Sequence, residues 1–90
     1  MTAHLLQPSL DTAAAAPLRL ELLARMTGGQ PLVLDGSGVT RVGLACLQVL
    51  ASAQATAAAQ GLAFGITDPS ASLRAMASLA GMNAVLEPQG

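Results

Sequence analysis

The chain has 90 residues, of which 52% are hydrophobic and one is aromatic, and its four basic and five acidic residues give a net charge of −1. This length fits one domain spanning residues 1–90, and a hydrophobic chain with little net charge is not intrinsically disordered. The single cysteine excludes a disulfide scaffold or a cysteine-built zinc site within the chain, and four dispersed arginines without any lysine argue against a nucleic-acid partner.

The first half of the sequence predicts an edge strand, a helix and a buried strand. Residues 3–7 form the short edge strand. Asp11 or Thr12 can cap a helix that continues to about Met26, because these side chains can accept hydrogen bonds from the first helical N–H groups. Either this helix starts near Ala16 with Pro17 in its first turn, or a longer helix from Ala13 loses a hydrogen bond at Pro17 and bends. The apolar run over residues 31–35 lies between turn residues and is typical of a central strand buried on both faces.

The predicted N-terminal helix has distinct inner and outer sides. Glu21 and Arg25 are four residues apart, which predicts an ion pair on the outer side. The inner side is an apolar stripe of Leu18, Leu22, Leu23 and Met26.

The second half continues the alternation of helices and strands. Residues 44–60 predict a helix rich in alanine and leucine, and residues 62–67 predict a strand. Ser70 caps a last helix over residues 71–80, and Val85-Leu86 adds a final short strand. This alternation predicts an α/β fold with at least one parallel strand pair and helices packed on the sheet.

The helix over residues 44–60 has one apolar side and one uncharged polar side. The polar side consists of Gln48, Ser52, Thr56 and Gln60, each four residues from the next. A partner protein could cover these side chains without desolvating ions, which favours a binding role. An ordinary polar helix surface explains the same pattern equally well.

A membrane-spanning segment is an alternative interpretation of the long charge-free stretch between Arg41 and Asp68. Five Gln, Ser and Thr side chains interrupt that stretch, and much of the rest is weakly apolar alanine, so we reject this interpretation. The N-terminus has neither the basic start nor the long apolar run of a signal peptide. We therefore expect a cytoplasmic protein that does not insert into a membrane.

Groups for enzyme chemistry are few. The single His4 lies near a terminus and the single Cys46 lies in an apolar stretch, so a Cys–His nucleophile pair is not indicated. No two carboxylates have a spacing that suits general acid–base catalysis. The sequence predicts a protein that is not an enzyme and that has no metal and no cofactor.

The loop Asp35-Gly36-Ser37-Gly38 is a glycine-containing turn after the predicted central strand. It lacks the third glycine of a dinucleotide-binding loop and the lysine of a phosphate-binding loop, which favours a simple tight turn. Open α/β sheets place functional loops at the carboxyl ends of their strands. The surface around residues 35–45 is therefore the best site candidate, and a small ligand near Asp35 stays an alternative.

Three segments carry a resemblance to a known family: residues 33–42 (VLDGSGVTRV), residues 47–50 (LQVL) and residues 60–64 (QGLAF). Their order and spacing resemble the STAS domain, the family of bacterial anti-sigma factor antagonists. The resemblance implies an α/β fold in which three to four helices pack on a small mixed β-sheet of four to five strands.

The family's phosphorylation motif, Asp-Ser-x-Gly, lies at the start of the helix after the loop. Aligned on the Leu-Gln-x-Leu that follows, the motif falls on Gly43-Leu44-Ala45-Cys46. Leu44 has no hydroxyl group, so this position cannot accept a phosphoryl group. Ser37 or Thr40 is the alternative phosphate acceptor, and for each the simpler interpretation is hydrogen bonding in a turn.

The resemblance implies a regulatory adaptor that docks on another protein through this loop and the first turns of the helix. The partner classes are a serine kinase-like anti-sigma factor, a chemotaxis or signalling component, and an ATPase of a transport complex. Leu44 or Val42, if exposed, provides an apolar anchor. The predicted partner-binding residues are Gly43, Leu44, Ala45, Gln48, Ser52 and Thr56.

Overall fold

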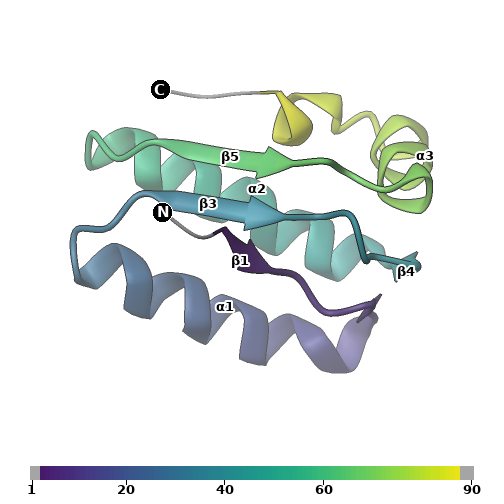
Figure 1. Cartoon of the computed structure of the whole chain (residues 1–90), viewed down its shortest axis with the longest axis horizontal. Coiled ribbons are helices and arrows are strands. Elements are labelled where there is room, and N and C mark those ends of the chain that lie inside the picture. The colour runs from purple at the N-terminus through teal and green to yellow at the C-terminus, as the bar shows by residue number, and fades with distance from the viewer. Residues whose placement is uncertain (1–2, 88–90) are drawn as a thin grey trace.

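Three parallel strands form the main sheet in a computed structural model that describes residues 3–87 (Figure 1). β3 (Leu32–Asp35) lies between β1 (His4–Leu5) and β5 (Phe64–Thr67). A second sheet contains β2 (Ser9–Leu10) and β4 (Arg41–Val42), also parallel. The predicted α/β fold is confirmed, although the strands of residues 3–87 form two parallel sheets and not one mixed sheet.

Three α-helices and one short 3₁₀-helix complete the chain. α1 (Thr12–Thr27) connects β2 to β3, α2 (Leu44–Ala59) connects β4 to β5, and α3 (Ala71–Leu79) precedes η1 (Asn83–Leu86). In Figure 1 α2 lies behind β3 and β5 and α1 lies below β1, and both helices run back from the carboxyl ends of the strands. None of the helices in residues 3–87 is long and apolar enough to cross a membrane.

Two predicted helix caps are confirmed by their hydrogen bonds. The Asp11 carboxylate accepts from the N–H of Ala14 at 3.1 Å, so Asp11, and not Thr12, caps α1. The Ser70 hydroxyl accepts from the N–H of Leu73 at 3.1 Å and caps α3. Each bond satisfies a donor that the first helical turn leaves without a partner inside the helix.

The main sheet is buried on one face, which corrects the expectation that β3 is covered on both. Leu32 and Leu34 are fully buried and align with Phe64 and Ile66 of β5 on the face toward the helices. Val33, on the opposite face, is only half-buried. Alternate side chains of a strand point to opposite faces, so the layer of helices on one side buries every second residue.

The C-terminal strand predicted at Val85-Leu86 is wrong, because these residues belong to η1. The N–H of Val85 donates to the carbonyl of Met82 at 3.1 Å, as in a 3₁₀ turn, and the Val85 side chain is buried in the core. A two-residue apolar segment can enter the core from a helical turn as well as from a strand, so its pattern does not decide between them.

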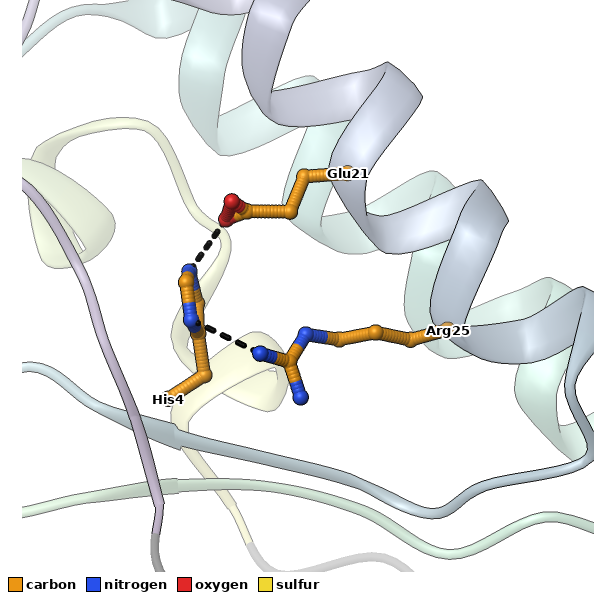
Figure 2. Close-up of polar contacts among 3 residues, drawn as sticks. All are labelled: His4, Glu21 and Arg25. Carbon is orange, nitrogen blue, oxygen red and sulfur yellow. Dashed lines mark hydrogen bonds and ion pairs between the residues drawn. The ribbon is translucent and has the colours of Figure 1, made fainter.

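His4 lies between Glu21 and Arg25, which corrects the predicted direct ion pair of α1 (Figure 2). The Arg25 guanidinium donates to Nδ1 of His4 at 3.0 Å, and the Glu21 carboxylate contacts Nε2. Arginine can only donate, so Nδ1 is the acceptor and Nε2 carries the proton that faces Glu21. The ring thereby joins the edge strand β1 to the C-terminal half of α1.

Gly36, at the end of β3, occupies a position without room for a side chain. A Cβ there would lie 3.0 Å from Cγ2 of Ile66, 3.0 Å from Cδ2 of Leu73 and 3.3 Å from Cα of Pro69. The close approach brings β3, β5 and the start of α3 together.

We expect Gly36→Ala to lower the free energy of unfolding by about 1–3 kcal/mol, because the methyl group overpacks this junction. Gly38→Ala is the matched control, since a Cβ at Gly38 meets no atom within 4 Å. Urea unfolding of both variants checks this. Equal stability of Gly36→Ala and Gly38→Ala would contradict the packing argument.

Candidate functional site

The loop after β3 is a turn that its first residue stabilises. The Asp35 carboxylate accepts from the backbone N–H of Ser37 at 2.9 Å. This backbone hydrogen bond is the main reason why the pKa of Asp35 is lowered, and a hydrogen bond from the Ser37 side chain contributes less. The carboxylate thus has a local structural role, and within residues 3–87 no cluster of three His, Cys, Asp or Glu side chains is placed to hold a metal ion.

The two hydroxyl residues predicted as alternative phosphate acceptors have different surroundings. The Thr40 hydroxyl donates to the carbonyl of Pro8 at 3.1 Å, and the Thr40 backbone N–H donates to the same oxygen at 2.8 Å. Ser37 is exposed at the tip of the loop. Thr40 is exposed as well, but its hydroxyl is occupied in joining the loop to the N-terminal segment.

The start of α2 exposes one of the two candidate apolar anchors. Gly43 is the N-cap residue and its N–H donates to the carbonyl of Leu10 at 2.9 Å. The next residue, Leu44, is 53% exposed, whereas Val42 is buried in the core. Leu44 is thus the anchor that remains, and no serine or threonine occurs from Arg41 to Leu47.

Cys46 is a structural residue of the first turn of α2. Its side chain is fully buried, and its thiol donates to the carbonyl of Asp11 at 3.2 Å. Burial, with a smaller contribution from the charge of Asp11, raises the pKa of the thiol, which disfavours the nucleophilic thiolate. His4 contacts Glu21 and Arg25 instead, so the structure does not bring the two residues together as a catalytic pair.

An open groove of about 420 Å³ runs between α1 and α2. Four predicted partner-binding residues line its α2 side: Ala45, Gln48, Ser52 and Thr56. Gln48 and Ser52 are exposed, and Thr56 is half-buried with its hydroxyl donating to the carbonyl of Ser52. The other two predicted partner-binding residues, Gly43 and Leu44, are at the N-terminal end of α2 and are not among the residues that line the groove.

Sequence reasoning missed the α1 side of this groove. That side consists of Ala15, Arg19, Leu22, Leu23 and Met26. Leu22, Leu23 and Met26 were predicted as part of the inner stripe, whereas Ala15 and Arg19 were not assigned; of the α1 residues, Leu18, Leu22 and Met26 are buried. Arg19, an isolated charge beside this apolar stripe, was the feature of the sequence that could have indicated a binding surface on α1.

The family model described as "Mlab, STAS domain" matches residues 5–87. The chain belongs to the STAS domain family. No curated protein and no solved structure matches the chain. STAS domains are generally non-enzymatic regulatory modules that interact with protein partners.

The family match agrees with the resemblance seen in the sequence. The matched residues include the loop after β3, α2 and both sides of the groove. The elements predicted to form the site therefore lie within one STAS domain. Among residues 3–87, Arg19 is the one charged residue that lines the groove.

We expect Asp35→Asn to reduce the acid sensitivity of folding. The amide oxygen can still accept from Ser37, but it does not titrate. Because the folded state lowers the pKa of Asp35, its stabilising contribution is present above the unfolded pKa and is lost as the pH falls through the folded pKa. The wild type should therefore lose more stability than the variant between about pH 5 and about pH 3. Urea midpoints at both pH values measure this, and identical losses would refute it.

Proposed function

We propose that this STAS domain is a non-enzymatic regulatory protein of the bacterial cytoplasm that binds a partner protein through the exposed side of α2. The partner belongs to one of three classes: a serine kinase-like anti-sigma factor, a chemotaxis or signalling component, or an ATPase of a transport complex. Binding is reversible and does not use a phosphoserine at the start of α2.

The observation that carries this proposal is the uncharged, accessible surface along α2. Gln48 and Ser52 are exposed, and neither makes a side-chain hydrogen bond within residues 3–87. Leu44 adds an apolar side chain that is 53% exposed at the start of the same helix. A partner can cover this surface without removing water from a charge, and the amide and hydroxyl groups can bond to it.

Gln48→Lys combined with Ser52→Glu should abolish binding, because it places two charges where a partner would have to desolvate them. The test is affinity capture of the tagged domain from its native cell, followed by quantification of a stoichiometric partner. The control variant, Ala75→Lys with Ser78→Glu, makes the same charge changes on exposed positions of α3. Loss with both variants, or with neither, would reject the α2 surface as the docking site.

A second candidate is a phospho-regulated antagonist that uses Ser37, which is exposed, whereas the Thr40 hydroxyl is bonded to the carbonyl of Pro8. Phosphorylation of Ser37 adds about 80 Da and a double negative charge beside Asp35. Intact-mass measurement of the protein purified from its own host, with Ser37→Ala and Thr40→Ala as controls, checks this. Absence of the added mass in every growth state rejects the phosphorylated switch.

A further inference from the structure

We infer that the groove between α1 and α2 binds an amphipathic α-helix of the partner, and that a carboxylate of this helix pairs with Arg19. This inference rests on the proposed function and adds the chemistry of the partner. It follows from the length of the groove, from the character of its walls and from its single charge.

The groove is as long as a short helix. Its α1 wall extends from Ala15 to Met26 and its α2 wall from Ala45 to Thr56, so each wall covers about 16 Å of helix axis. On both helices the lining residues recur every three or four positions, which places them along one side. Two neighbouring helices with an open furrow between them are the packing surface for a third helix.

The walls favour an apolar segment over an extended strand. Leu23 on α1 and Val49 on α2 are half-buried and line the groove, and the buried Leu22, Met26 and Ala53 form its floor. An extended peptide gains its affinity from backbone hydrogen bonds to a sheet edge, whereas the backbone groups of α1 and α2 are bonded within the helices. A helix satisfies its own backbone groups and needs only apolar side chains to fit these walls.

Arg19 determines the charge of the occupant. It is exposed, it lies in the groove, and within residues 3–87 it forms neither a salt bridge nor a side-chain hydrogen bond. Among residues 3–87 no acidic side chain lines the groove, so a second copy of this chain docked groove to groove brings no carboxylate from its groove to Arg19. The complementary partner is a helix with leucine-like residues on one side and Glu or Asp at its border.

Two synthetic helical peptides, each stapled and about four turns long, test this inference. Both carry leucines on one side; one has glutamates along the border of that side and the other has lysines at the same positions. In fluorescence anisotropy titrations, the glutamate peptide should bind the wild-type domain at least about tenfold more tightly than the lysine peptide. Arg19→Glu should reverse this preference.

Two control variants separate the groove from the rest of the surface. Ser52→Trp fills the groove and should abolish binding of both peptides. Arg74→Glu changes the same charge on α3, outside the groove, and should leave the preference unchanged. Equal affinity for the two peptides, no binding of either, or an unchanged preference in Arg19→Glu overturns the inference.

Two other occupants of the groove, a fatty acid and a second copy of this chain, would give different results in these experiments. Tighter binding of dodecanoate than of either peptide, lost in Arg19→Glu, assigns the groove to a fatty acid and overturns the helix. Dimerisation of the wild type that Ser52→Trp abolishes assigns it to a second copy and does the same. If charged substitutions on α2 release the native partner but Arg19→Glu does not, the proposed function stands and the acidic helix is rejected.

Discussion

The packing of α1 and α2 on the same face of the β1-β3-β5 sheet is the contact on which the other features depend. Leu47 and Leu50 of α2 and Leu22 of α1 are fully buried, and with the leucines of β3 they form the centre of the core. With a single aromatic residue in the chain, this core is assembled mainly from leucine side chains. Ala53 and Ala57 of α2 are buried in it as well, so small side chains also contribute to this core.

The same small residues explain the groove. Ala15 on α1 and Ala45 and Ala53 on α2 all line it. Larger side chains at these positions would fill the space between the helices, whereas methyl groups leave it open toward the solvent. The composition that allows close packing beneath the helices thus also leaves an accessible apolar furrow above them.

Local signals made most of the elements predictable from the sequence. The carboxylate of Asp11 and the hydroxyl of Ser70 cap their helices as expected, because a cap depends on atoms only two or three residues away. The apolar run of β3 and the position of the turn at Asp35 were predictable for the same reason. The helix that carries Gln48 and Ser52 was assigned correctly from its alanine and leucine content.

The failures concern contacts between distant segments. The spacing of Glu21 and Arg25 suggested a direct pair, but His4 comes from a different element and inserts between them. The segment around Val85 was predicted as a strand, but a 3₁₀ turn is enough to bury the Val85 side chain in the core. The groove needed the relative placement of α1 and α2, so the sequence predicted its α2 side and left Arg19 unassigned.

The absence of a hydroxyl group from Arg41 to Leu47 changes how binding at α2 can be controlled. A phosphoryl group at a helix start acts by adding charge to the docking surface itself, and this chain offers no acceptor there. Under the proposed function, control therefore comes from the partner, through the exposure of its acidic helix, or from the loop at Ser37. Since the α2 surface is uncharged, adding or removing a single carboxylate near Arg19 changes a large part of the electrostatic contribution to binding.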